Sequence, residues 1–261
     1  MPQDEPIFHT RRIDGATWLA LGIGLALACV VLAMPRLRFV LSYLTVLIHE
    51  FGHAVVGWVF GYASIPAFDF TYGGGITTID HRSPWLLGFV YVLFVGILCA
   101  YRRNRTTLVC LVVALGVFAL CAHTAAHKVL ILFMGHGMEL LLAGVFLYRA
   151  LSGSAVVHGA ERPLYAACGF FIVFSDMAFA HGLWSNSAHR AAYANAKGGG
   201  HMMDFSRIAM DYLGVKLPSV AFFFLVCCVV PLVVSVVVYR YQERIFDFLA
   251  RRVEREPEAT S

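Results

Sequence analysis

The sequence predicts an all-α, polytopic membrane protein, a bundle of about seven transmembrane helices with a short β-turn or hairpin after the second. Hydrophobic residues make up 59% of the 261 residues, charged residues only 14%, and the mean hydropathy is +0.73. Soluble domains usually carry about 25% charged residues. The apolar residues also form blocks of about 20, the length that carries a helix across the roughly 30 Å of bilayer hydrocarbon. These features exclude an ordinary soluble enzyme.

Seven blocks of this length contain no Lys or Arg: residues 16–34, 39–60, 84–101, 106–123, 129–148, 164–183 and 218–239. The first follows Arg11 and Arg12, as in a signal peptide, but it is longer than the usual core of about 7 to 15 residues and lacks a clear cleavage site. We therefore predict it as a span. Residues 1–240 are expected to form one integral-membrane domain, and residues 241–261 a charged, cytoplasmic tail.

The net charge of +4 does not indicate a nucleic-acid partner, because the basic residues lie in short clusters beside the span ends. The bilayer is the partner that this pattern predicts. With seven spans, more Lys and Arg fall on the side of the C-terminus, which predicts a cytoplasmic C-terminus and an N-terminus on the opposite side. The seven cysteines lie in the apolar blocks without a C-x-x-C pair, as small buried residues do. The sequence carries no signal for an oligomeric state.

Two connections between the blocks have structure of their own. In residues 61–83, a glycine turn precedes β-branched residues up to Ile79, which predicts a turn leading into a short strand or hairpin from Tyr72 onward. In residues 184–217, the helical spacing of Phe205, Ile208 and Tyr212 predicts a short amphipathic helix after the glycines at 198–200.

The second block contains the motif His49-Glu50-Phe51-Gly52-His53. Positions i and i+4 share one helix face, so both imidazoles can bind one ion while the glutamate holds a water beside it. A zinc ion with three protein ligands keeps a fourth position for water and lowers the pKa of that water. Glu50 is the candidate general base. Ionisable groups at this depth in a span usually mark a functional cavity.

This motif inside an apolar span resembles that of the site-2 protease family, the intramembrane zinc metallopeptidases, and particularly its small, membrane-only bacterial members. The resemblance covers residues 42–75 and, more loosely, 198–217. It implies a helical bundle with zinc below the surface of a bacterial cytoplasmic membrane. It also implies hydrolysis of peptide bonds in or near transmembrane segments of membrane-anchored protein substrates, which a β-hairpin after the motif span would hold in extended form.

Relatives commonly supply the third zinc ligand as an aspartate from a later segment, often within Asp-Gly. The Asp-Gly of this chain, Asp14-Gly15, precedes the first span, so the nearest counterpart is Asp204. An aspartate in the first turn of a helix is also favoured by the helix dipole alone. Three other side chains stay open as the third ligand, namely His201, Glu139 and His136.

A second polar cluster supports a different class of function. His123 and His127 are spaced i, i+4, and His136 and Glu139 are spaced i, i+3, so either pair could bind a metal. One alternative is therefore a metal-ion or proton transporter that uses these intramembrane groups. Another is a proteolytically inactive, metal-binding relative. The plain structural explanation pairs Glu139 with His136 or Lys128.

The sixth block holds two further polar residues, Asp176 and His181. Hydrogen bonds between neighbouring helices explain both. The motif alone does not select zinc, because imidazole and carboxylate ligands suit several divalent ions.

Overall fold

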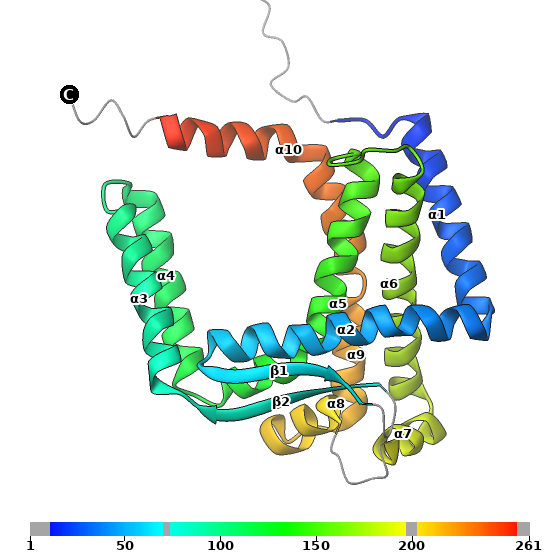
Figure 1. Cartoon of the computed structure of the whole chain (residues 1–261), viewed down its shortest axis with the longest axis horizontal. Helices are drawn as coiled ribbons and strands as arrows, with labels where there is room; N and C mark the ends of the chain where they lie inside the picture. The colour runs from blue at the N-terminus through cyan, green and yellow to red at the C-terminus, as the bar shows by residue number, and fades with distance from the viewer. Residues whose placement is uncertain (1–10, 70–73, 197–202, 255–261) are drawn as a thin grey trace, which may run out of the picture.

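The computed structural model describes residues 11–69, 74–196 and 203–254 (Figure 1). Nearly all of them are helical. The helices are α1 (Gly15–Ala33), α2 (Pro35–Val59), α3 (Pro84–Ala100), α4 (Arg105–Ala122), α5 (Ala126–Ser152), α6 (Glu161–Ser185), α7 (Ser187–Ala194), α8 (Asp204–Arg207), α9 (Leu217–Cys227) and α10 (Val230–Glu254). A π-helical segment, η2 (Ile208–Leu213), follows α8, and two strands, β1 (Tyr62–Phe68) and β2 (Gly75–Arg82), lie between α2 and α3.

Six helical segments are long and apolar enough to cross a membrane, by length and composition. They are α1, α2, α4, α5, α6 and the segment Leu217–Ile245, which joins α9 to the first part of α10. The mostly helical fold and these six candidate spans agree with the predicted class of polytopic helical membrane protein. The count of seven is not confirmed, because the block at 84–101 forms α3, a shorter apolar helix of 17 residues.

Local sequence signals set the helix boundaries. Asp14 accepts a hydrogen bond from the Thr17 amide at 2.8 Å and so caps the start of α1. Pro35 has no amide hydrogen to continue α1, and it opens α2 instead. Gly153 ends α5 with φ of +65°, a left-handed conformation that glycine adopts without strain. The chain therefore turns where its caps and prolines predict.

The motif helix α2 runs across the other long helices, whereas α1, α5 and α6 stand side by side (Figure 1). Its close crossing with α5 depends on Gly52. A Cβ atom at Gly52 would lie 2.0 Å from the Met134 carbonyl oxygen of α5. The two backbones therefore touch at this point, and the residues of α2 on either side of Gly52 are held against α5.

The α3–α4 hairpin stands apart from the rest of the bundle (Figure 1). No residue of α3 is buried, and α4 buries only Phe118 and Ala122. A helix that is apolar on every face needs an apolar environment. Lipid is the environment that suits this pair of helices.

A two-stranded antiparallel sheet lies along α2 (Figure 1). Ile65 pairs with Thr78, and Ala67 pairs with Ile76. The predicted turn at Tyr72 and Gly73 lies outside the described residues. The sheet matters for the site because β2 places its first residues beside the motif of α2.

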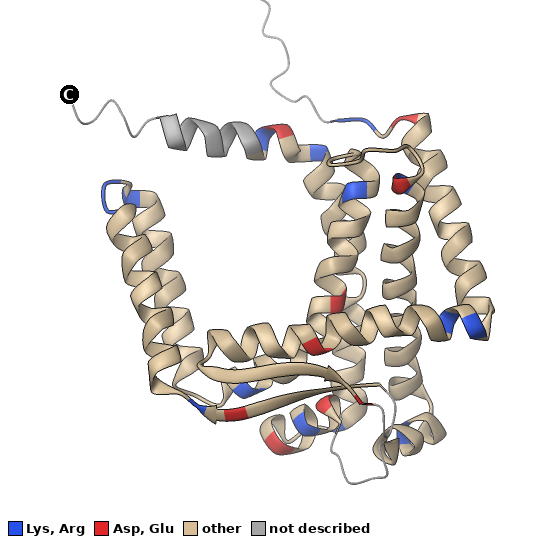
Figure 2. Ribbon diagram, viewed as in Figure 1, with Lys and Arg blue, Asp and Glu red and all other residues tan. Residues whose placement is uncertain are grey.

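The residues just before α1 contact α10. The Arg11 amide donates to the Arg240 carbonyl at 3.3 Å, and the Tyr239 hydroxyl donates to the Arg12 carbonyl at 3.1 Å. Figure 2 shows basic residues at this end of the bundle, where the α3–α4 connection also lies. The described residues Arg11, Arg12, Tyr239 and Arg240 therefore lie at one end of the bundle, which does not fit the expectation of termini on opposite sides of the membrane.

We expect an impermeant maleimide to label single cysteines at Arg103→Cys and Glu243→Cys from the same side of the membrane, and at Asp80→Cys from the other. The reason is that the α3–α4 connection and α10 share one end of the bundle, while β2 lies at the opposite end (Figure 1). The unsubstituted chain measures background from the native cysteines. Labelling of Arg103→Cys and Glu243→Cys from opposite sides would contradict the arrangement.

Candidate metal centre

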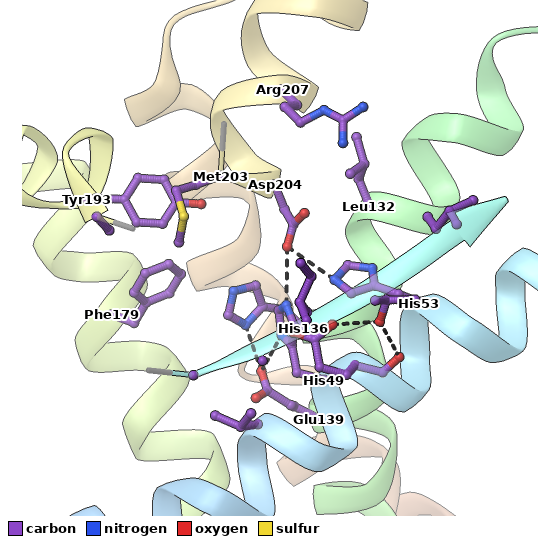
Figure 3. A pocket seen from close by; sticks show the side chains of 18 residues that line it. His49, His53, Leu132, His136, Glu139, Phe179, Tyr193, Met203, Asp204 and Arg207 are labelled. Atoms are coloured by element: carbon purple, nitrogen blue, oxygen red, sulfur yellow. Dashed lines mark hydrogen bonds and ion pairs between the residues drawn. The ribbon is translucent and has the colours of Figure 1, made fainter. Parts of the chain in front are cut away.

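Two histidines of α2 and one aspartate of α8 converge on a common point (Figure 3). The Nε2 atoms of His49 and His53 each lie 3.2 Å from Oδ2 of Asp204. Their sequence separation from Asp204 is 155 and 151 residues, so the fold alone brings the three together. The side chain predicted as the third ligand thus lies beside the motif histidines, whereas the alternative His201 lies outside the described residues.

The spacing of these donor atoms fits one metal ion. Ligands about 2.0 to 2.1 Å from a tetrahedral ion lie about 3.3 Å from one another, close to the 3.2 Å between each Nε2 and the carboxylate oxygen. His49, His53 and Asp204 form one of the groups whose ligand atoms are close enough to share an ion. Two imidazoles and a carboxylate form a donor set used by catalytic zinc sites. These residues could hold a divalent cation.

The backbone of α5 orients His53. Its Nδ1 lies 2.7 Å from the carbonyl oxygen of Ile131, which can only accept a hydrogen bond. A proton on Nδ1 is therefore donated to this carbonyl, and Nε2 could present its lone pair to a cation bound between His53 and Asp204. A histidine that binds metal usually donates its other N–H in this way, which sets its tautomer and ring direction.

Asp204 is held as a carboxylate at the start of α8. Burial acts to raise the pKa of its carboxyl group, but hydrogen bonds with His49 and His53 outweigh burial and hold this pKa well below the usual range. The Tyr193 hydroxyl accepts a hydrogen bond from the Phe205 amide at 3.2 Å and so anchors α8 against α7. Burial and the charge of Asp204 raise the pKa of Tyr193, which keeps it a neutral phenol. The carboxylate is the form that binds metal.

Glu50 projects from α2 toward β2. The Thr77 hydroxyl lies 2.6 Å from its Oε2 and 3.0 Å from its backbone oxygen. A Cβ atom at Gly75 would lie 2.5 Å from Oε1 of Glu50. Glycine at this position therefore lets β2 approach the carboxylate, and Thr77 orients it.

The two histidines, Glu50 and Asp204 line one cavity of about 460 Å³ (Figure 3). Gly74 and, from β2, Gly75, Ile76, Thr77 and Ile79 line one wall, and α5 contributes Leu132, His136 and Glu139. Since a water molecule takes about 30 Å³ of liquid volume, the cavity has room for several waters or a short peptide segment. The candidate base and the candidate ligands therefore share one solvent space.

Two of the alternative ligands form a second group behind His49. Glu139 Oε2 lies 2.7 Å from His136 Nδ1 and 3.7 Å from His49 Nδ1. His136 Nδ1 also lies 3.3 Å from Oδ1 of Asp176. His49, His136 and Glu139 are close enough to share an ion of their own. Of the two partners expected for Glu139, the structure shows His136.

The histidines at the junction of α4 and α5 have other partners. The Tyr91 hydroxyl lies 3.0 Å from His123 Nε2, and the Tyr62 hydroxyl lies 2.9 Å from His127 Nε2. In the part of the chain that the structure describes, neither histidine belongs to a group that could share an ion. Their i, i+4 spacing thus does not bring them to one metal site here.

Gly135 is a site residue that the sequence did not reveal. A Cβ atom at this position in α5 would lie 2.6 Å from ring atoms of both His49 and His53. Glycine inside a helix costs about 1 kcal/mol relative to alanine. The sequence feature that could have indicated this position is the pair of glycines, Gly135 and Gly137, on either side of a histidine in an apolar block.

No protein-family model, curated protein or solved structure matches this chain. The residues of the cavity are therefore the basis for the function proposed below.

We expect Gly135→Ala to weaken zinc binding at least about tenfold, because the added methyl group displaces both imidazoles without removing a ligand. Equilibrium competition with a chelator measures the affinity. Gly144→Ala is the matched control on α5, since its Cβ would meet only Pro231 at an ordinary 3.7 Å. Equal affinities of the two variants would show that α5 does not need to approach the histidines this closely.

Proposed function

We propose that this chain is a membrane-embedded zinc metallopeptidase that hydrolyses peptide bonds in or near transmembrane segments of membrane-anchored protein substrates. One observation carries the proposal: the Nε2 atoms of His49 and His53 each lie 3.2 Å from Oδ2 of Asp204, in the cavity that Glu50 also lines. The resemblance of residues 42–75 to the site-2 protease family supports the same chemistry. By that resemblance, the protein resides in a bacterial cytoplasmic membrane.

The three ligands and the base have separate tasks. A zinc ion bound by the ligands would supply a Lewis acid that polarises the scissile carbonyl and a nearby water. Glu50 accepts a proton from water in the cavity and delivers it to the amide nitrogen as the C–N bond breaks. Its hydrogen bond from Thr77 orients the carboxylate for both transfers. The buried position of Glu50 limits its exchange with bulk water.

β2 offers the substrate a place beside these groups. A transmembrane helix must unwind before its peptide bond can reach a base, and an extended peptide can add to a strand edge through backbone hydrogen bonds. One edge of β2 pairs with β1, and within the described residues no further strand pairs with β2. The residues of β2 that line the cavity place an added strand next to Glu50.

Glu50→Gln tests the proposed base. We expect the variant to bind about one zinc per chain, since no ligand is removed, and to lose cleavage by roughly 10²- to 10⁴-fold because the amide cannot accept the proton. Elemental analysis of purified protein and cleavage of a model transmembrane substrate measure the two effects. Glu243→Gln, on the exposed face of α10, is the control.

Two results would count against the proposal. If purified wild-type protein contains no bound metal, the proposed metal centre is wrong. If Glu50→Gln cleaves normally, Glu50 is not the base. Metal or proton transport in vesicles at an unchanged rate in this variant would instead favour the transporter.

Asp204→Ala tests the third ligand. Loss of one of three ligands should lower zinc occupancy to a small fraction of the wild-type value, measured by elemental analysis after dialysis. Asp211→Ala is the matched control in η2, because Asp211 is exposed and its partner among the described residues is Arg207, at 3.9 Å. Full occupancy in Asp204→Ala would move the assignment to Glu139, His136 or His201.

A further inference from the structure

A chain of buried polar side chains extends from the candidate centre into the bundle. His49 of α2 faces Glu139 of α5, which contacts His136 one turn earlier, which in turn contacts Asp176 of α6. Glu139 and Asp176 are each 5% exposed. The proposed hydrolysis gives none of these last three residues a role.

We propose that Glu139 is a positioning residue that orients His49 for metal binding, and that His136 and Asp176 hold Glu139 in place. This inference rests on the proposed metal centre. It assigns no substrate contact to any of the three residues.

The two motif histidines differ in what lies behind them. His53 donates from Nδ1 to a backbone carbonyl at 2.7 Å, which is a fixed acceptor. His49 has its Nδ1 3.7 Å from a side-chain carboxylate oxygen, an ion-pair distance. A carboxylate behind a metal-binding histidine orients the ring and makes the other nitrogen a stronger donor. Glu139 therefore lies behind His49 as the Ile131 carbonyl lies behind His53, at a longer distance and with a carboxyl group in place of a carbonyl.

Glu139 can orient His49 only if its own side chain is fixed in one rotamer by another contact. His136 provides that contact, at 2.7 Å between its Nδ1 and Oε2 of Glu139. The same Nδ1 lies 3.3 Å from Asp176 Oδ1, so this ring nitrogen lies between two carboxyl groups. Asp176 thus places a second carboxyl oxygen beside Nδ1 of His136.

The surroundings of His136 strengthen these interactions. Three aromatic rings have their centroids within 5.0 Å of the His136 ring, those of Phe179, Phe205 and Phe224. Charges interact more strongly in such an apolar environment than in water. Among the residues that the structure describes, buried Oδ2 of Asp176 has no hydrogen-bond partner. A buried polar atom that is left unsatisfied costs stability, which a purely structural polar pair does not explain.

The test measures zinc affinity by chelator competition in purified full-length protein. We expect Glu139→Gln to weaken binding about tenfold and Glu139→Ala about 100-fold, the range found when such partners are removed. Asp176→Asn should weaken it less than Glu139→Ala. Asp80→Asn, exposed on β2, and Glu243→Gln, exposed on α10, should leave affinity unchanged.

A double variant separates positioning from general damage to the fold. If Asp176 acts through Glu139, Asp176→Asn should weaken binding no further when Glu139→Ala is already present. The visible spectrum of the cobalt-substituted protein should retain the wild-type bands in every variant, because the ligands themselves are unchanged. A merely structural loss would be additive and would reduce the fraction of folded protein.

Several outcomes would overturn the inference. An unchanged zinc affinity in Glu139→Ala would overturn it. If the wild-type protein still bound metal and cleaved substrate, the proposed function would stand. Two bound ions per chain would make His136 and Glu139 ligands of a second site. A cobalt spectrum that changes in His136→Ala would make His136 a ligand of the first. Absence of metal from wild type would overturn both this inference and the proposed function.

Discussion

The backbone contact between α2 and α5 is the constraint on which the rest of the structure depends. Gly52 lets α2 touch the Met134 carbonyl, and Gly135 lets α5 pass beside the rings of His49 and His53. Because neither glycine has a side chain, the motif histidines lie against a rigid helix instead of in lipid. The Ile131 carbonyl can then orient His53. One close crossing therefore accounts for both the position and the direction of the candidate ligands.

The cost of burying charge explains why the polar residues of the bundle cluster. Buried carboxylates are tolerated only with partners, and each carboxylate near the cavity has one: Asp204 contacts His49 and His53, Glu50 contacts Thr77, and Glu139 and Asp176 share His136. These groups come from α2, β2, α5, α6 and α8. A single polar cavity thus links elements that otherwise pack through apolar side chains.

The proposed chemistry divides between the two sides of α2. On one side, β2 meets Glu50 and leaves an edge for an extended peptide. On the other, α5 and α6 supply the groups behind His49, while α8 supplies Asp204. The edge of β2 that would hold a substrate and the groups that hold the metal ligands therefore lie in different places. Tyr193 anchors α8, so the position of Asp204 depends on the packing of α7.

The sequence by itself determined the class and the motif. Apolar blocks require a membrane, and i, i+4 spacing places His49 and His53 on one face, because both follow from local chain geometry. Hydropathy records how apolar a segment is and not its direction. Only the tertiary structure could therefore show that α2 runs across the bundle and that the residues before α1 lie beside α10. Asp204 and Gly135 also belong to the site only through packing, since they meet α2 from distant parts of the chain. Tertiary structure decided these features because contacts between distant segments leave no periodicity in sequence.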